Sequence, residues 1–474
     1  MISVVRLRAW PALEERRVVA KAQRHKEGAS NTADGGADNF VPSAHVPMCL
    51  LDQAACLGTL VSSFHGRPLD RKGIQAALES ACFENNETKP VYQLIKPGES
   101  VCIVVSDHTR RSAADLILPV LLQGLRSRGC SIEDMCILFA SGIHRHPTSP
   151  EIEKILGPET AREFSGRIFL HNPDDRRELV SVGRIAAGRE VFINRKAVEA
   201  DRLVSIGAAM FHYHAGFGGG RKSIVPGIAD RATIAYTHGL TIDPVYDRLR
   251  KGVAIGKMDG NPVSEAMFAC ARLCEPDFII NTVLAPGGKD GKLVGVFAGE
   301  MNIAHRKACG LVEKVSRVDI SRKADFVIAS AGSATNWIQS HKAFYNAHRA
   351  VHEKGIVILE AKCPEGIGNE RFRYWVRKRD LGEIFAGLRK ESEVNGQTAL
   401  STCLRAPRTV LVTRLDKADL ADLGMRSAKN TAEAARLAVR DLMSAGIENP
   451  CYYIIPEALY VVPFCSDDKG RIDG

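Results

Sequence analysis

The sequence lacks several features that mark particular classes of protein. Its 474 residues contain no run of eighteen apolar residues, as a membrane span needs, and no unbroken apolar stretch after the first basic residues, as a secretory signal needs. Its 13 cysteines include no Cys-x-x-Cys pair and are odd in number, so they resemble neither a disulfide framework nor a zinc site. The sequence therefore predicts a soluble protein of the reducing cytoplasm.

Aromatic residues are also scarce, at 6% of the chain, which argues against a surface that stacks on nucleic-acid bases. The formal net charge of +9 points the other way, but residues 1–26 alone hold seven Lys and Arg against two Glu. Without this segment the chain is only mildly basic. We therefore expect neither nucleic acid nor a membrane among its partners.

What the sequence does contain is two stretches in which apolar β-rich runs alternate with helical patterns, as in parallel sheets covered by helices. We expect strands near 100–110, 135–145, 167–172, 201–209, 277–285 and 292–299, and again near 324–333, 355–361 and 408–415. The predicted class is α/β, with two Rossmann-like domains of mainly parallel sheet and an active-site cleft between them. The predicted units are a flexible basic extension (1–50), an N-terminal domain (51–315), a C-terminal domain (316–464) and a tail (465–474).

Polar clusters follow three of the expected strands in the first unit. They are "SDHTRR" after the strand near 100–110, "SGIHRH" after the next, and "FHYHAGFGGGRKSIVPGI" (211–228) after the strand that ends near residue 208. In parallel α/β sheets the carboxyl ends of strands are where ligands bind. The three clusters are therefore the candidate site.

The glycine-rich segment of the third cluster suggests a phosphate-binding loop, but it fits neither common template. In "GFGGGRKS" the position of the last Walker A glycine is Arg221, and the same residue breaks G-x-G-x-x-G. Successive backbone N–H groups can still cradle an anion beside Arg221. Two interpretations stay open: a protein that binds a nucleotide or phosphate through this loop, or glycines that merely allow a tight turn.

Lys222 and three histidines carry the other chemical signals. Arg221 beside Lys222 favours the neutral amine that a covalent linkage needs, although an exposed lysine is the ordinary alternative. His212 and His214 alternate by two, so both project from one face of an extended segment, where they can bind metal or simply form hydrogen bonds. His238 lies sixteen residues beyond Lys222 and means nothing by itself.

Taken together, these motifs resemble the nickel-dependent lactate racemase family. That family shows D-x-T-R, then G-x-H-R, then H-x-x-A-G-F-S-G-G-R-K-x-I-x-P-G with a histidine sixteen residues past the lysine. The corresponding segments here are "DHTR" (107–110), "GIHR" (142–145), "HYHAGFGGGRKSIVPG" (212–227) and His238. Further matches at "FIINTVL", "GVFAGEMNIAH" and "IQSHKA" extend the resemblance over roughly residues 57–464.

The resemblance implies a cofactor, the nickel-pincer nucleotide, a pyridinium mononucleotide whose ring carbon and two sulfurs hold nickel. Lys222 would bind it covalently and His238 would be the fourth nickel ligand, a donor set that suits square-planar Ni(II). The cofactor would also contact Asp107, His108, Thr109, Arg110, Gly218, Gly219, Gly220 and Arg221, the glycines and Arg221 cradling its phosphate. Other proteins would have to make and load it.

The resemblance also implies the reaction, racemisation or epimerisation of a 2-hydroxy carboxylic acid through a 2-keto acid. Removing the α-hydrogen as a proton would leave a carbanion beside a carboxylate, and hydride transfer avoids this. His144 and His212 match the two general bases, one for each enantiomer. Arg110, Gln339 and Lys342 match positions that bind the substrate. The family does not use His214, which we interpret as a supporting or solvated residue.

Departures from the family pattern gather around the substrate rather than the cofactor. Ile338 replaces an aromatic residue before the family glutamine, and Gly396 stands where a tryptophan is expected. Both changes remove aromatic walls, so we expect a pocket for a 2-hydroxy acid bulkier than lactate, with Trp337 as a candidate to refill the space.

Overall fold

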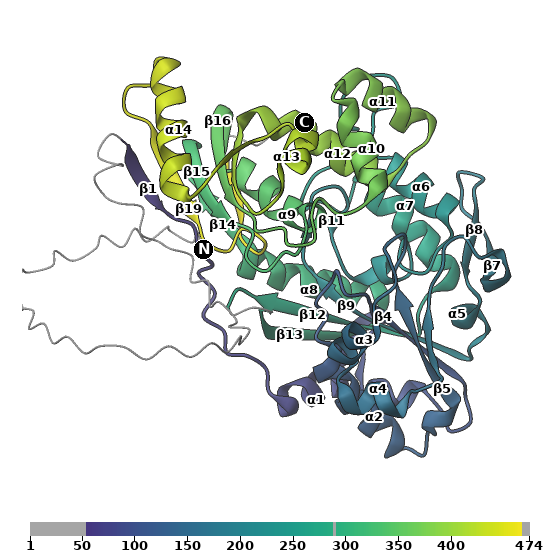
Figure 1. Ribbon diagram of the computed structural model, residues 1–474. Coiled ribbons are helices and arrows are strands. Elements are labelled where there is room, and N and C mark those ends of the chain that lie inside the picture. The colour runs from purple at the N-terminus through teal and green to yellow at the C-terminus, as the bar shows by residue number, and fades with distance from the viewer. Residues whose placement is uncertain (1–53, 288–290, 467–474) are drawn as a thin grey trace, which may run out of the picture.

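The computed structural model describes residues 54–287 and 291–466, and its ribbon is built around two large sheets (Figure 1). The first sheet has eight strands in the order β3-β2-β13-β12-β9-β4-β5-β6, and its five strands from β12 to β6 run parallel. These five are β12 (Phe278–Ala285), β9 (Arg202–Ala209), β4 (Val101–Ser106), β5 (Met135–Ala140) and β6 (Ile168–Leu170). The remaining three are β13 (Lys292–Gly299), antiparallel to β12, and the short strands β2 (Ala81–Cys82) and β3 (Thr88–Lys89).

Helices cover both faces of this sheet because alternate side chains of its strands point to opposite faces. Ile103 and Val105 of β4 pack into one core with α1 to α4, whereas Cys102 and Val104 pack into another with α5 to α7. The first group comprises α1 (Arg71–Glu79), α2 (Ala114–Arg126), α3 (Ser149–Leu156) and α4 (Pro158–Glu163). The second comprises α5 (Arg195–Glu199), α6 (Arg231–Gly239) and α7 (Pro262–Ala271). α8 (Met301–Ser316) joins the second core and continues along β12 and β13.

The second sheet has six strands, all parallel, in the order β1-β19-β15-β16-β17-β18. They are β1 (Ala55–Thr59), β19 (Cys451–Ile455), β15 (Ala324–Ser330), β16 (Val351–Glu360), β17 (Thr409–Val412) and β18 (Arg426–Ala428). α14 (Thr431–Ser444) covers one face. The other face packs against α9 (Trp337–His348), α10 (Glu370–Lys378), α11 (Leu381–Lys390), α12 (Val394–Arg405) and α13 (Lys417–Leu423).

The predicted α/β class and every expected strand are confirmed. The predicted start of the N-terminal domain at residue 51 is wrong, because the first strand, β1, belongs to the second sheet. β1 hydrogen-bonds to β19 from Ala55↔Cys451 to Thr59↔Ile454, so the chain begins in the second sheet before it enters the first. The predicted tail is wrong at Cys465, which ends β20 (Val462–Cys465) beside β14 (Arg317–Ile320). The predicted extension (1–50) and residues 467–474 of the predicted tail lie outside the described residues. Within the described part of the chain, no helix is long and apolar enough to span a bilayer.

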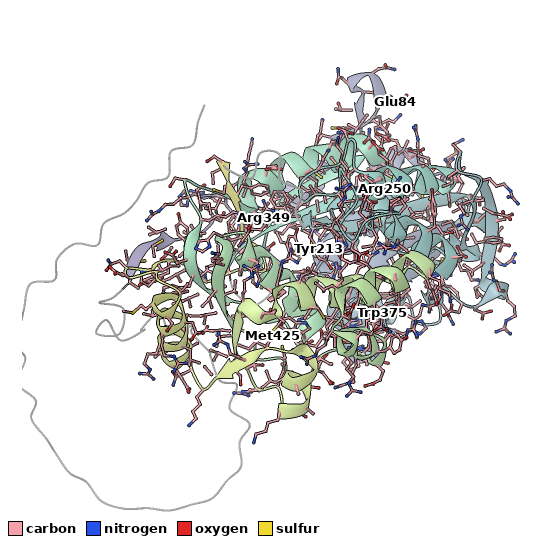
Figure 2. The ribbon with its side chains drawn as sticks, turned by 90° about the horizontal axis from the view of Figure 1, so that it is seen from above. Glu84, Tyr213, Arg250, Arg349, Trp375 and Met425 are labelled. Atoms are coloured by element: carbon pink, nitrogen blue, oxygen red, sulfur yellow. The ribbon has the colours of Figure 1, made fainter. Side chains whose placement is uncertain are left out.

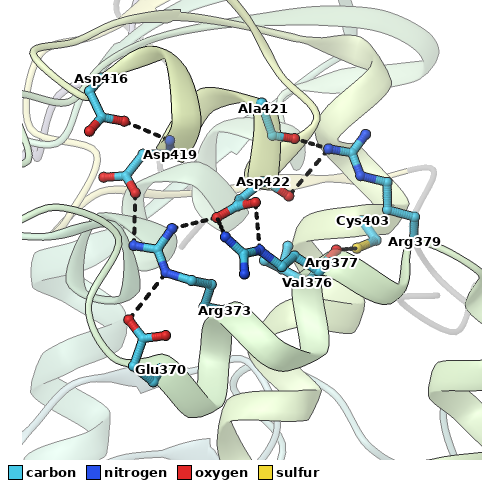
Figure 3. Close-up of polar contacts among 10 residues, drawn as sticks. All are labelled: Glu370, Arg373, Val376, Arg377, Arg379, Cys403, Asp416, Asp419, Ala421 and Asp422. Carbon is cyan, nitrogen blue, oxygen red and sulfur yellow. Dashed lines mark hydrogen bonds and ion pairs between the residues drawn. The ribbon is translucent and has the colours of Figure 1, made fainter.

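An ion-pair network fastens α10 to α13 on the second sheet (Figure 3). Asp422 accepts hydrogen bonds from Arg377 at 2.7 and 3.0 Å and a further one from Arg373, and Arg373 also reaches Asp419 at 2.9 Å. The hydrogen bond from Arg377 is the main cause that lowers the pKa of Asp422; burial opposes it, and Arg373 adds to it. The network therefore stabilises the fold while Asp422 is ionised.

We expect Asp422→Asn to lower the free energy of unfolding at pH 7 by about 1 kcal/mol, because a partly buried network loses its central charge. Since the folded pKa lies below the unfolded value, this contribution is complete above the unfolded value of about 4 and disappears as the pH falls through the folded pKa. Thermal unfolding of wild type and variant between pH 7 and pH 3 measures the difference between their free energies of unfolding at each pH.

Glu190→Gln is the matched control, because the Arg184–Glu190 pair is exposed and its partners lie 3.3 Å apart. We expect a change within about 0.5 kcal/mol. If the stability difference between wild type and Asp422→Asn stays constant down to pH 3, the effect does not come from this carboxylate.

Candidate active site

The candidate site lies at the carboxyl ends of three neighbouring strands, β9, β4 and β5. Asp107 follows β4, His144 follows β5, and β10 (Phe211–His212) follows β9. The sheet order places β4 between the other two, so the three polar clusters of the sequence meet at one edge. Tyr213 is labelled near the middle of the molecule in Figure 2, where the two halves of the chain meet.

Asp107 holds His144 in place. Its buried carboxylate lies 2.7 Å from His144 Nδ1, while its other oxygen accepts hydrogen bonds from the Thr109 backbone N–H at 3.0 Å and hydroxyl at 2.6 Å. Burial raises the pKa of Asp107, but His144 and the Thr109 hydroxyl outweigh it and keep the pKa below the ordinary value. An ionised Asp107 places the His144 proton on Nδ1, so that Nε2 carries the lone pair.

His212 lies in β10, which forms a tight hairpin with β11 (Gly216–Phe217). Its Nδ1 accepts hydrogen bonds from the backbone N–H groups of His214 and Ala215, both at 3.2 Å. Burial, followed by the charge of Lys222, lowers the pKa of His212 well below its ordinary value. The neutral ring therefore carries its proton on Nε2, the reverse of His144.

Lys222 faces His212, with its Nζ 3.2 Å from His212 Nε2. Burial lowers the pKa of this amine well below its ordinary value, and the guanidinium groups of Arg221 and Arg110 add to the effect. Both effects favour the neutral, nucleophilic form of the amine, and the sequence predicted the part that Arg221 contributes. The larger cause, burial, could not be read from the sequence.

His238 lies near the end of α6, and its Nδ1 lies 2.9 Å from the Ile234 carbonyl oxygen. Burial and the charge of Lys222 lower the pKa of His238 to about 3, although the hydrogen bond to Ile234 opposes them. The ring is therefore neutral, with Nδ1–H donating to the carbonyl and the lone pair on Nε2. Within residues 54–287 and 291–466, no three His, Cys, Asp or Glu side chains gather as a metal site, so a metal beside His238 would need donors from a cofactor.

Lys342 lies within range of the charges of Arg110 and Lys222 at the same edge. Burial lowers the pKa of Lys342 well below its ordinary value, and Arg110 and Lys222 lower it further. Arg110 donates to the Thr109 carbonyl at 3.0 Å. Gln339, one turn before Lys342 on α9, accepts from the Thr335 N–H and hydroxyl, both at 3.3 Å. A bound carboxylate would restore the charge of Lys342, so these residues suit an anionic group.

The glycine loop packs closely against protein, and two of its N–H groups already have partners there, so the phosphate cradle stays a prediction. The N–H of Gly218 donates to the Met210 carbonyl and that of Gly220 to Asn281 Oδ1, both at 2.8 Å. At Gly219 (φ +77°) a Cβ would lie 2.7 Å from Asn281 Oδ1, and at Gly220 (φ +53°) 2.5 Å from the His305 ring. These glycines permit close approach and a left-handed backbone.

Arg221 also differs from its predicted role. Its side chain is 2% exposed and turns into the protein, where it donates to the Ala215 carbonyl and the Ser264 hydroxyl at 2.9 Å and to the Ser264 carbonyl at 3.3 Å. Burial lowers its pKa to about 10. We therefore infer that Arg221 anchors the loop to Ala215 and Ser264 rather than binding phosphate.

His108 is the remaining member of the first cluster. Its Nδ1 is buried and has no hydrogen-bond partner among the described residues, and burial lowers the pKa of the ring. Such a nitrogen is free to bond to a ligand. Arg145 and His146 of the second cluster are held structurally instead: Arg145 pairs with Glu151 at 2.7 Å, and His146 Nε2 lies 3.0 Å from the His171 carbonyl oxygen.

The sequence analysis missed the contribution of α12 to the site. Gln397 Nε2 donates to the His238 carbonyl at 2.5 Å, which ties the second half of the chain to α6. Tyr213 also joins the halves, because its ring lies 5.0 Å from Tyr345 and 5.4 Å from His341, centroid to centroid. The one related signal in the sequence was Gly396, the residue before Gln397, at the position where the family has a tryptophan.

The expected pocket opening at Gly396 is absent in the described structure. A Cβ there would lie 2.9 Å from the Trp375 indole and 2.7 Å from Leu388, so these side chains fill the space. Trp337 does not refill it; its ring is fully buried, and Nε1 donates to the Thr402 hydroxyl at 3.2 Å. Ile338 packs against Gly368.

Comparison with known proteins places this geometry in a family. The domain family described as "Lactate racemase N-terminal domain" matches residues 50–248. A lactate racemase of Thermoanaerobacterium thermosaccharolyticum is 31% identical over 363 residues, 74% of this chain and 82% of that protein. A lactate racemase of Lactiplantibacillus plantarum is 31% identical over 68% of this chain and 74% of that protein.

Solved structures agree. The lactate racemase apoprotein of T. thermosaccharolyticum superimposes with a TM-score of 0.74 at 27% identity, covering 86% of this chain and 95% of that one. A Thermotoga maritima protein shares the fold, with a TM-score of 0.61 at 18% identity over 85% of this chain and 100% of that one. The sequence and the fold thus agree with the convergence of Asp107, His144, His212, Lys222 and His238 at one sheet edge: this chain belongs to the lactate racemase family.

Proposed function

We propose that this protein is a racemase or epimerase of a 2-hydroxy carboxylic acid that works through a nickel-pincer nucleotide bound to Lys222. The observation that carries the proposal is the buried Lys222 amine, whose pKa burial lowers, 3.2 Å from His212 at the sheet edge that also holds His144. A lysine kept neutral by burial is suited to a covalent linkage and poorly suited to a salt bridge.

The residues present fit that cofactor. Lys222 would provide the covalent attachment, neutral His238 Nε2 the nickel ligand, and the unpartnered His108 Nδ1 a polar contact. When bound, this group supplies a hydride acceptor, so the α-hydrogen leaves without a carbanion forming beside the carboxylate. The N–H groups of Gly218 and Gly220 are already hydrogen-bonded, so we infer that they do not bind the nucleotide phosphate.

His144 acts as one general base. Its Nδ1–H donates to Asp107, so Nε2 is free to take the hydroxyl proton of the substrate as the 2-keto acid forms, and the ionised carboxylate stabilises the resulting imidazolium. Asp107 thus positions His144, and both of its oxygens accept hydrogen bonds within the protein.

His212 is the general base for the opposite enantiomer, but the two histidines are not equivalent at rest. The backbone N–H groups that donate to His212 Nδ1 hold its lone pair on that nitrogen. To take a substrate proton at Nε2, the ring must first move its own proton to Nδ1. The substrate carboxylate is bound by Arg110, Lys342 and Gln339. This binding fixes the orientation of each enantiomer in the site.

The alternative, a phosphate-binding protein built on the glycine loop, has little support in this geometry. The loop lacks free N–H groups at Gly218 and Gly220, and the Arg221 guanidinium is buried away from the site. The loop is better explained as a packing device that brings Lys222 to the sheet edge.

The attachment residue is tested by Lys222→Ala. After co-expression with the enzymes that make the cofactor, intact-protein mass spectrometry should find an adduct on the wild type and none on the variant, and metal analysis should find nickel only in the wild type. Lys342→Ala is the control. This variant should keep the adduct and the nickel, but its KM for the substrate should rise. An unmodified, nickel-free wild type under these conditions would refute the proposal.

The two bases are tested by His144→Ala and His212→Ala. Both variants should retain adduct and nickel, while interconversion of the enantiomers, followed by chiral chromatography, falls about 10²- to 10⁴-fold because a general base is lost. His352→Ala, whose ring pairs with Asp325 on the second sheet, should leave the rate unchanged. Full activity of either site variant would show that its histidine is not a base.

The positioning role of Asp107 is tested by Asp107→Asn. An amide can donate to His144 Nδ1 and so favours the wrong tautomer, which should lower kcat by about 10²- to 10⁴-fold and change KM little. Adduct, nickel content and thermal midpoint should stay near the wild-type values. If KM rises while kcat is kept, Asp107 binds substrate instead of orienting His144.

A further inference from the structure

Two cysteines lie side by side on β4 and β5, neighbouring strands of the eight-stranded sheet (Figure 1). In the register of these strands, Cys102 pairs directly with Cys136. Paired residues of parallel strands point to the same face of the sheet, on strands about 4.8 Å apart. Both side chains accordingly pack in the core that α5 to α7 cover. A disulfide needs Cα atoms about 4.4–6.8 Å apart, so the two thiols can be joined with little movement of the backbone.

The two thiols differ in their access to solvent. Cys102 is 0% exposed, whereas Cys136 is half-buried. A small oxidant that arrives from solvent therefore meets Cys136, and Cys102 is shielded from it. The pair thus combines one accessible thiol with one thiol that can react only with its neighbour, which is the arrangement of a reactive cysteine beside a resolving cysteine.

A lysine beside the pair favours the thiolate of Cys136. Lys196 extends from α5 over β6, where its Nζ lies 4.4 Å from the centroid of the Phe169 ring. The hydrogen bond with Cys102 is the main cause that lowers the pKa of Cys136; burial opposes it, and the charge of Lys196 adds to it. The same hydrogen bond, followed by burial, raises the pKa of Cys102. Because the thiolate is the nucleophile, the accessible member of the pair is also the more reactive one.

We propose that Cys102 and Cys136 form a site of reversible oxidation, in which a peroxide converts the two thiols into a disulfide. The Cys136 sulfur attacks one oxygen of hydrogen peroxide, the O–O bond breaks, and a sulfenic acid and one water molecule form. The Cys102 sulfur then attacks the sulfenic sulfur, and the hydroxyl leaves with the Cys102 proton as a second water molecule. Two thiols are thus oxidised by two electrons while one peroxide is reduced to two water molecules, and a thiol reductant reverses the change.

This site is separate from the candidate active site. The pair lies toward the amino ends of β4 and β5, whereas Asp107 and His144 follow their carboxyl ends. The disulfide would fix the spacing of the two strands whose other ends carry the Asp107–His144 contact. The inference does not depend on the proposed function, because the oxidation needs neither cofactor nor substrate.

The test treats the folded full-length chain with hydrogen peroxide, removes the peroxide, and then alkylates the remaining thiols in denaturant. Tandem mass spectrometry should find a crosslink between Cys102 and Cys136, with a mass loss of about 2 Da, and dithiothreitol should remove it. Cys274→Ala is the matched control, because Cys274 is also half-buried and packs against the same core. This variant should form the crosslink as readily as the wild type.

Two further variants separate the roles of the two thiols. In Cys102→Ala the sulfenic acid of Cys136 has no thiol to react with, so it should proceed to the sulfinic acid, a mass gain of about 32 Da that the wild type does not show. In Cys136→Ala we expect Cys102 to stay unmodified, because it is shielded from solvent. The crosslink in the wild type needs no variant, so the test does not depend on how well these variants fold.

Three outcomes would overturn the inference. If Cys102 and Cys136 both stay open to alkylation at a peroxide dose that oxidises the exposed Cys56, the two cysteines merely fill the core. A crosslink from Cys136 to Cys274 would assign the chemistry to another pair. A Cys102–Cys136 crosslink that forms as fast in the urea-unfolded chain would show that the strand register does not create the site.

Discussion

The structure depends on keeping the Lys222 amine out of water without giving it a counter-charge. Burial lowers the pKa of Lys222, and the charges that act on it most are the guanidinium groups of Arg221 and Arg110. The same desolvation keeps His212 and His238 neutral, so three nitrogen lone pairs lie at one sheet edge. An ion pair at any of these positions would remove the reactivity that the arrangement provides.

The glycine loop and Arg221 make this burial possible. Adjacent side chains of the loop point in opposite directions: Lys222 faces His212, while Arg221 enters the core and donates to Ala215 and Ser264. Gly219 and Gly220 lie so close to β9, Asn281 and His305 that any Cβ would clash. The loop therefore acts as a rigid support, and its resemblance to a phosphate loop reflects the shared need for close backbone approach.

The two halves of the chain contribute different parts of the chemistry. The segments after strands of the eight-stranded sheet hold the two proposed bases and the proposed attachment residue, whereas α9 and α12 hold Gln339, Lys342 and Gln397. The hydrogen bond from Gln397 to the His238 carbonyl fixes the second half directly against the candidate nickel ligand.

Local patterns were enough to predict the α/β class, nine strands along the chain and the three clusters after β4, β5 and β9, because hydrophobic runs and strand ends are local features. The partners of each polar residue follow only from the folded chain. It paired Asp107 with His144, turned Arg221 inward, placed β1 in the second sheet and filled the space beside Gly396 with Trp375. These outcomes depend on contacts between segments far apart in the chain, which no local pattern specifies, and on burial, which sets the pKa of Lys222 and His238.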